Sequence, residues 1–210
     1  PTTSPTPLVS VGALLYASTL LDSACPGVHG AWSQDINARV TCNGTSTELA
    51  NSLPPTFNYL AGMFLNGLAD GSGIPNDYIL QVEALPEPSS QGAFGVLFRN
   101  QPDQPGHRHN GTYALLLNPS NGTWQAVVYD DVSGLPTYFA SGQFAFATNA
   151  SMIIDILVRE NTFTFYLNGV LLGQVTGPSN PNYSSGTIGF AVSTNTATLF
   201  KNIAIYVLPA

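Results

Sequence analysis

Charged residues are scarce in this sequence. Only 8% of its 210 residues are charged, whereas an ordinary globular chain has about 25%. Five Lys and Arg residues face twelve Asp and Glu residues, which gives a formal net charge of −7. A nucleic-acid-binding protein needs a basic patch to neutralise phosphates, and this chain has too few cations to form one. The composition therefore excludes nucleic acid as a partner, and it indicates a surface of Ser, Thr and Asn of the extracellular kind.

Cysteine is almost absent, since the chain holds only Cys25 and Cys42. Two cysteines in a secreted chain most simply pair with each other. Closing a loop of this length contributes on the order of 3 kcal/mol in the chain-entropy model. A structural zinc site would need more ligands at suitable spacing, and the three histidines do not supply them. We therefore predict a Cys25–Cys42 disulfide, no metal and no cofactor.

Long hydrophobic runs are missing as well. The best candidate, Leu8–Leu21, is interrupted by Ser, Gly and Thr and is shorter than the ~20 residues that a spanning helix requires. We expect it to form one or two strands, the first of the domain. Residues 1–7 read PTTSPTP, a Pro/Thr-rich linker that favours extended geometry. The sequence thus predicts a linker over 1–7, one domain over 8–210 and no membrane-spanning segment.

Catalytic motifs are the last absence. The chain has no G-x-S-x-G, H-E-x-x-H, P-loop or G-x-G-x-x-G. Glycoside hydrolysis needs two converging carboxylates, and the nearest approximation is Glu83 with Glu87, where Pro86 already indicates the end of a strand. The other acids near predicted strands, interpreted as solvent-facing or turn residues, are Asp130, Asp131, Asp155 and Glu160. We therefore predict that the protein is not an enzyme.

Strand patterns, in contrast, are plentiful. Phe163, Phe165 and Leu167 alternate with Thr162, Thr164 and Tyr166, the period of a strand with one buried face. Asn168-Gly169 follows, the dipeptide best suited to a type I′ hairpin turn, and Val170–Thr176 returns. Further strands are predicted over Gly186–Val192 and Ala197–Val207. Periodicity does not decide whether Asn58–Leu68 is a short helix or a strand.

This order of strands resembles the laminin-G-like, concanavalin-A-like jelly-roll domains found in extracellular modules of bacterial surface proteins. The segments that carry the resemblance are FYLNGVLLGQV (165–175), YSSGTIGFAV (183–192) and FKNIAIYVL (200–208), with Tyr78–Leu85, Gly92–Asn100 and Gly111–Asn118 upstream. The resemblance implies an all-β, antiparallel jelly-roll β-sandwich at an extracellular or cell-surface location. It leaves the function open, because this fold hosts lectins, glucanases, adhesins and passive spacers.

Glycosylation signals are frequent for a chain of this size. N-x-S/T sequons without proline, all in or beside predicted turns or strand ends, occur at Asn43, Asn110, Asn121, Asn149 and Asn182. Chance can also produce sequons in a chain rich in Asn, Ser and Thr. We expect N-linked glycans on two or more of these residues.

Aromatic side chains offer a candidate sugar-stacking surface, although most aromatics in a sandwich serve packing. The aromatic residues that could form such a surface are Tyr113, Trp124, Tyr129, Tyr138, Phe139, Tyr166 and Tyr183. Among them, the candidate ligand-binding residues are Trp124, Tyr129 and Tyr138. Trp124 and Tyr129 should face opposite sides of the strand predicted over Thr123–Asp130, because successive side chains alternate.

Two hypotheses of function follow. The first is a structural or adhesive subunit of an extracellular filament or surface layer that self-associates through residues 1–16. Such an extended segment can join the sheet edge of another subunit, and its strand-forming residues are Leu8, Val9, Val11 and Leu14. The alternative is a lectin-like carbohydrate-binding or sensor domain with a polysaccharide ligand.

Overall fold

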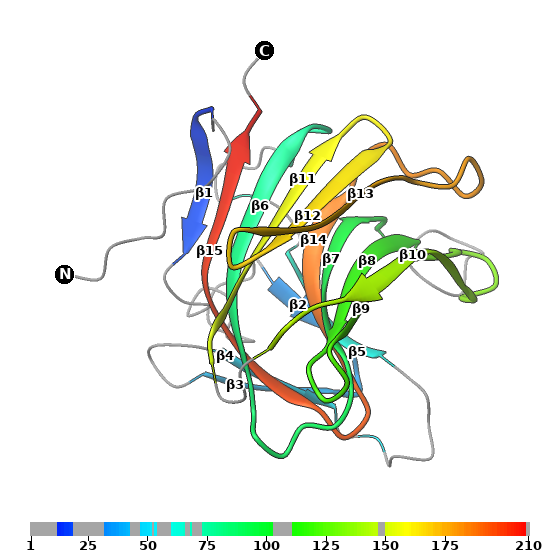
Figure 1. Cartoon of the computed structure of the whole chain (residues 1–210). Helices are drawn as coiled ribbons and strands as arrows, with labels where there is room; N and C mark the ends of the chain where they lie inside the picture. The colour runs from blue at the N-terminus through cyan, green and yellow to red at the C-terminus, as the bar shows by residue number, and fades with distance from the viewer. Residues whose placement is uncertain are drawn as a thin grey trace.

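The computed structural model describes residues 12–18, 32–42, 47–51, 53, 60–65, 68, 73–102, 111–146 and 150–208. Within these ranges the chain forms fifteen β-strands in two antiparallel sheets and no helix. The sheets pack face to face as a β-sandwich (Figure 1). The predicted all-β, antiparallel sandwich is confirmed. The described residues contain no helix that could span a membrane.

Sheet A contains eight strands. In spatial order seven of them are β13 (Val170–Thr176), β12 (Thr162–Leu167), β11 (Met152–Arg159), β6 (Tyr78–Pro86), β15 (Ala197–Val207), β4 (Thr47–Asn51) and β3 (Ala38–Cys42). The eighth, β1 (Leu14–Ser18), pairs with the second half of β15.

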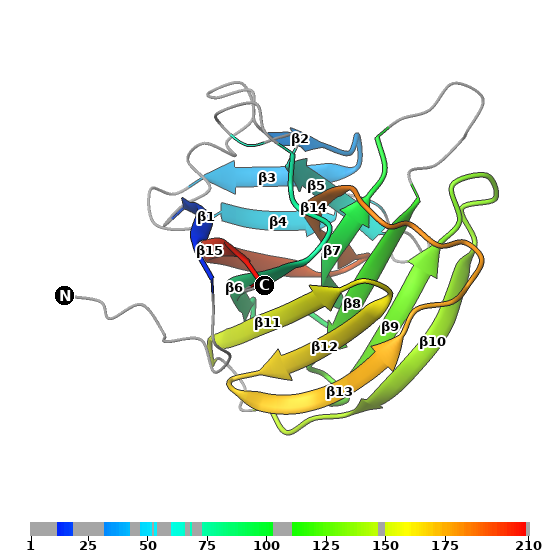
Figure 2. The same cartoon turned by 90° about the horizontal axis from the view of Figure 1, so that it is seen from above.

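Sheet B contains seven strands. Their order is β10 (Pro136–Gln143), β9 (Thr123–Tyr129), β8 (Thr112–Asn118), β7 (Phe94–Asn100), β14 (Thr187–Ser193), β5 (Leu60–Leu65) and β2 (Trp32–Gln34). Seen from above, β13 of sheet A lies beside β10 of sheet B (Figure 2). The segment Asn58–Leu68, which periodicity left open, therefore contains a strand.

The Asn168-Gly169 hairpin is confirmed with the strand limits that the sequence predicts. Asn168 and Gly169 have φ of 49° and 79°, and Leu167 pairs directly with Val170. The Asn168 side chain adds a contact of its own, because its Oδ1 accepts a hydrogen bond of 2.8 Å from the Ile153 backbone N–H on β11. The turn therefore fixes the register of three strands.

The core lies between the sheets and is rich in aromatic rings. On β12, Phe163 and Phe165 point into it, as their alternation predicts, and both are fully buried. Phe98 on β7 lies 5.0 Å from Phe163 between ring centroids, so the two sheets meet through ring contacts. Such pairs contribute about 0.5–1.5 kcal/mol each beyond the area they bury.

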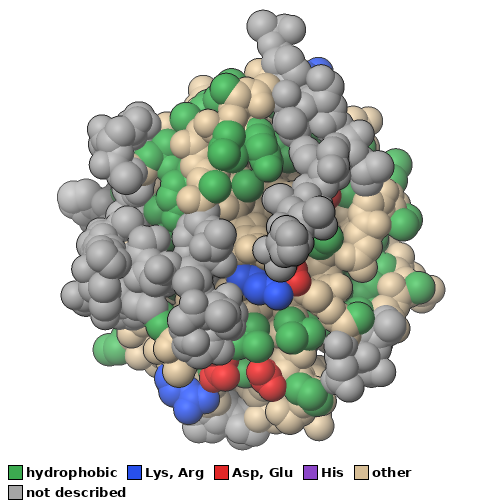
Figure 3. Space-filling model, turned by 90° about the vertical axis from the view of Figure 1, so that its left-hand side faces the viewer, with side chains coloured by type: hydrophobic (Ala, Val, Ile, Leu, Met, Phe, Trp, Pro, Cys, Tyr) green, Lys and Arg blue, Asp and Glu red, His purple; other side chains and the backbone are tan. Residues whose placement is uncertain are grey.

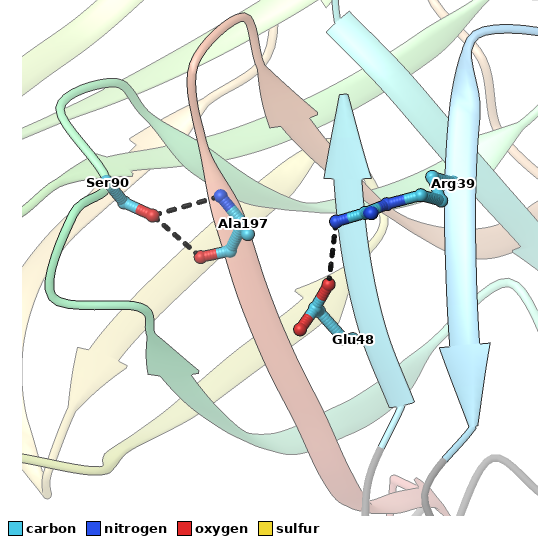
Figure 4. Close-up of polar contacts among 4 residues, drawn as sticks. All are labelled: Arg39, Glu48, Ser90 and Ala197. Atoms are coloured by element: carbon cyan, nitrogen blue, oxygen red, sulfur yellow. Dashed lines mark hydrogen bonds and ion pairs between the residues drawn. The ribbon is translucent and has the colours of Figure 1, made fainter. Parts of the chain in front are cut away.

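Hydrogen bonds and an ion pair link strands and a loop of sheet A (Figure 4). Ser90, in the connection between β6 and β7, donates to the Ala197 carbonyl at 2.8 Å and accepts from the Ala197 N–H at 2.9 Å. Across β3 and β4, Arg39 and Glu48 form an ion pair of 3.3 Å. On the face shown in Figure 3, charged side chains are few among hydrophobic and neutral polar ones, as the composition predicts.

The N-terminal segment is described only from residue 12. Leu14 begins β1, which pairs with β15 of the same chain, and the Gly12 N–H donates to the Val207 carbonyl at 3.0 Å. The described part of the proposed connector thus occupies a place in its own sheet, and these contacts give the connector role no support. Leu8, Val9 and Val11 lie outside the described residues.

Candidate ligand pocket at one end of the sandwich

A pocket of about 440 Å³ opens at the end of the sandwich where β6 begins and β7 and β11 end. Four separate segments meet there because antiparallel neighbours bring the start of one strand beside the end of the next. We call this hollow the end pocket. Its lining residues, all polar, are Asn76, Asp77, Arg99, Glu160, Asn161, Asn182 and Ser184.

The β11–β12 turn forms one wall of the end pocket. Arg159 pairs with Thr162, so Glu160 and Asn161 make a two-residue hairpin loop in which Glu160 has a φ of 49°. The Glu160 N–H donates to Asp77 Oδ1 at 2.7 Å, which ties this turn to the segment before β6. The Glu160 carboxylate has no hydrogen-bond or ion-pair partner within the described residues. It is therefore available to a ligand.

Arg99 organises the base of the pocket. It is 1% exposed, and its guanidinium donates to the carbonyls of Tyr183 and Asn76, each at 3.1 Å. The guanidinium carbon lies 5.5 Å from the ring centroid of Phe163, a cation–π arrangement. No carboxylate of the described residues forms an ion pair with it, and its Nε has no hydrogen-bond partner there.

Burial lowers the pKa of Arg99, and the nearby Tyr78, Tyr113 and Asp77 act in the opposite direction. An arginine stays protonated in a protein. The pocket thus keeps a buried positive charge whose direct contacts within the described residues are two backbone carbonyls and an aromatic ring.

The loop after β13 forms another wall of the end pocket. Tyr183 points inward, where its ring lies edge-on to Tyr113 at 5.9 Å and its hydroxyl accepts from the Asp131 N–H at 3.1 Å. Burial raises the pKa of Tyr183 to about 12, so its hydroxyl stays protonated at neutral pH. Because Tyr183 is anchored inward, its neighbours Asn182 and Ser184 line the pocket.

A second hollow of about 350 Å³ lies on the outer face of sheet A, and we call it the sheet A groove. Paired positions of β11, β12 and β13 form it, since Leu157 faces Thr164 and Thr164 faces Gln174 in the strand register. Its lining residues are Leu157, Arg159, Glu160, Thr162, Thr164, Tyr166 and Gln174. Glu160 lines both hollows.

Residues 74–206 match the family model of the 3-keto-alpha-glucoside-1,2-lyase-like domain. The chain belongs to this family. The matched range contains the whole end pocket and the sheet A groove. Comparison with curated proteins gave no match.

Solved structures similar to this family member share its fold at low sequence identity. A Bacillus subtilis protein of unknown function with a galectin-like fold is 12% identical, with a TM-score of 0.74 over 95% of this chain and 99% of the other. The carbohydrate-binding module CBM66 from Bacillus subtilis is 12% identical, with a TM-score of 0.65 over 84% and 95%. The exoplasmic/lumenal domain of VIP36, bound to Ca²⁺ and Man3GlcNAc, is 11% identical, with a TM-score of 0.59 over 86% and 84%. These neighbours support a concanavalin-A-like jelly roll and do not single out the laminin-G type.

The three aromatic candidates from the sequence lie on different sides of sheet B. Trp124 is 4% exposed in the main core, in contact with Gly142 of β10 and Gly173 of β13. Tyr129 packs on the outer face of sheet B against a second apolar cluster, so it and Trp124 do face opposite sides of β9. The buried members of this cluster are Leu97, Ala114, Leu116, Val127 and Ala191. Tyr138 is 56% exposed and pairs with Val127, a member of that outer cluster. Tyr129 and Tyr138 thus share a surface that excludes Trp124.

The remaining predicted sites are only partly described. Asn121 sits in an exposed turn, where its Oδ1 accepts from the Thr123 N–H at 3.1 Å, and Asn182 lines the end pocket. Cys42 ends β3. The other predicted site residues outside the described ranges are Cys25, Asn43, Asn110 and Asn149. The disulfide and the glycans therefore stay predictions.

Sequence reasoning singled out only Asn182, as a sequon, and Glu160, as a turn acid, among the residues of the end pocket. One signal for the pocket was present in the sequence. Arg99 is a lone cation at the end of the apolar run GAFGVLF, and a charged residue in a buried strand needs an explanation. Asn76 and Ser184 carried no such signal.

Proposed function

We propose that this domain is a non-enzymatic carbohydrate-binding module that recognises a sugar through the end pocket. The observation that carries the proposal is the lining itself, in which amide, carboxylate, hydroxyl and guanidinium groups converge on one hollow. Sugar hydroxyls both donate and accept hydrogen bonds, and this set of side chains offers both kinds of partner. The pocket volume also falls within the roughly 300–1,000 Å³ of typical ligand sites.

The fold neighbours support the same class of function. They include a carbohydrate-binding module and a lumenal domain solved with a mannose-containing glycan. We prefer carbohydrate recognition to the structural-subunit hypothesis, because the described part of the N-terminal segment is already paired within its own sheet. An extracellular or surface location, N-linked glycans, self-association and the Cys25–Cys42 bridge remain part of the proposal.

Isothermal titration with soluble mono- and oligosaccharides of glucose, mannose and fructose tests the proposal. We expect saturable binding that Ser184→Ala weakens several-fold, since the variant removes one hydroxyl from the pocket wall. Ser179→Ala is the matched control, because Ser179 lies in the same loop, is exposed and does not line the pocket. If no saccharide binds the wild-type protein, the proposal is wrong.

The same titration also tests a second candidate binding surface. Tyr129 and Tyr138 share the outer face of sheet B, where an exposed ring can stack on a sugar. Loss of binding in Tyr138→Ala, with Ser184→Ala unaffected, would move the ligand site to that face.

A carbohydrate-cleaving activity is the second candidate function, and the carboxylates of Asp77 and Glu160 in one pocket favour it. Hydrolysis of a glycosidic bond commonly uses two carboxyl groups that flank the bond. The family description also refers to a lyase acting on a keto-glucoside. Incubation of the protein with glucosides and 3-keto-glucosides tests it: product formation that Glu160→Gln abolishes would establish an enzyme.

A further inference from the structure

The end pocket and the sheet A groove meet at the β11–β12 turn. Glu160 lines both, the Asp77 side chain that holds this turn lines only the first, and Arg159 lines only the second. The groove runs over β11, β12 and β13, which lie side by side in Figure 1. A ligand seated in the end pocket therefore has the sheet A groove on the other side of Glu160.

The groove has the chemistry of a second sugar site. Tyr166 supplies an aromatic ring and a hydroxyl, and Gln174 holds its amide in place by donating to Thr164 Oγ1 at 3.1 Å. The Arg159 guanidinium and the Tyr166 hydroxyl have no hydrogen-bond partner within the described residues. An aromatic ring beside free polar groups matches a sugar, which has an apolar ring face and a polar edge.

Charge across the two hollows selects an uncharged ligand. Arg99 and Arg159 supply two positive charges, and Asp77 and Glu160 supply two negative ones. Because these charges balance, neither a strongly anionic nor a strongly cationic ligand gains from the field of the whole site.

We propose that the ligand is an uncharged glycan chain of at least two linked sugar rings, with one ring in the end pocket and the next in the sheet A groove. The inference rests on the proposed function, which requires only that some sugar binds in the end pocket. Each hollow alone is at the small end of the roughly 300–1,000 Å³ range of ligand sites. A chain that passes Glu160 fills both.

The test is a titration of one sugar series at increasing chain length. The probes are the mono-, di-, tri- and tetrasaccharides of whichever glucose, mannose or fructose series binds the wild-type protein. We expect the affinity to rise steeply from one ring to two or three and then to level off. Tyr166→Ala should lower the affinity for the longer probes roughly tenfold and leave the monosaccharide affinity unchanged. Tyr206→Ala is the matched control, since Tyr206 faces outward on the same sheet and lines neither hollow.

A second measurement does not depend on the folding of Tyr166→Ala. In the wild-type protein, the side-chain amide signal of Gln174 in an NMR spectrum should shift with the disaccharide and stay in place with the monosaccharide. Equal affinity at all chain lengths, or a Gln174 signal that never moves, would overturn the extended site and leave the proposed function intact. Failure of every probe to bind would instead overturn the proposed function, and the extended site with it.

Discussion

Arg99→Met is the substitution that best tests whether Arg99 organises the end pocket. Methionine is unbranched and apolar, so it can occupy much of the space of the arginine stem above Phe163. It cannot donate to the Tyr183 and Asn76 carbonyls, which hold the loop after β13 and the segment before β6 against β7. We expect the end pocket to lose its shape although the two sheets remain packed.

The change in the free energy of unfolding that we expect for Arg99→Met is the difference between opposing contributions. Each hydrogen bond from a charged donor is worth about 1.5–3 kcal/mol, and the cation–π contact adds about 1–2 kcal/mol in a buried setting. Removal of a buried cation without an acidic partner returns several kcal/mol of desolvation free energy. We therefore expect a net loss of about 2–4 kcal/mol in the free energy of unfolding. For a chain of 210 residues this lowers Tm by roughly 5–15 °C.

Thermal unfolding by circular dichroism measures the loss, and sugar titration measures the pocket. Arg39→Met is the control, because Arg39 is exposed and pairs with Glu48 on the surface, where an ion pair is worth only about 0–1 kcal/mol. An Arg99→Met variant that has the same Tm as the wild-type protein and binds sugar equally well would refute the organising role of Arg99. Arg99→Lys keeps the charge and loses the planar guanidinium, so its Tm should lie between those of the wild-type protein and Arg99→Met.

Three further predictions follow from particular contacts. Gly169→Val should destabilise the fold by about 1–2 kcal/mol, because a β-branched residue resists the φ of 79°; an unchanged urea midpoint would contradict this. Burial tends to raise the pKa of Glu83, but hydrogen bonds, including that from Lys201 at 3.0 Å, outweigh it and hold the pKa below 4.5. Its contribution to stability is therefore present above pH 4.5 and lost as the pH falls through the lower folded pKa, so Glu83→Gln should flatten the acid limb of a Tm–pH profile. Protein glycosylated at Asn182 should bind sugar more weakly than protein from a non-glycosylating host, and enzymatic deglycosylation should restore binding; equal affinities before and after deglycosylation would contradict the placement.

The strands were predictable where local chemistry agreed with the fold. In β12, the alternation of Phe163 and Phe165 with threonines places both phenylalanine rings on the buried face, and Asn168-Gly169 favours a type I′ hairpin turn after it. The β5 strand (Leu60–Leu65) lacked such agreement. Its sequence LAGMFL has no alternation because both faces are covered, the core on one side and the second apolar cluster on the other. Local pattern therefore could not separate a strand from a helix there.

The end pocket was not predictable because its residues are brought together by topology. Asp77 and Glu160 are distant in the sequence and become neighbours only because β6 pairs with β11. Proximity along the chain points instead to a different pair of acids, Glu83 and Glu87. In the structure Glu83 instead takes part in a surface network with Lys201 and Asn202. Spacing along one strand is a poor guide when a site is assembled from strand ends.

The same topology explains why the aromatic residues mislead a search for a sugar site in this chain. Phe98, Tyr113 and Phe163 form a continuous set of ring contacts inside the sandwich, and Arg99 rests on the last of them. The rings thus support the end pocket from below, and the groups that a ligand meets there are the polar ends of the loops. Tyr166 differs because it stands on the outward face of β12, between Phe165 and Leu167 that point inward. Its position in the strand register therefore makes Tyr166 the ring on β12 that can stack on a sugar beside the end pocket.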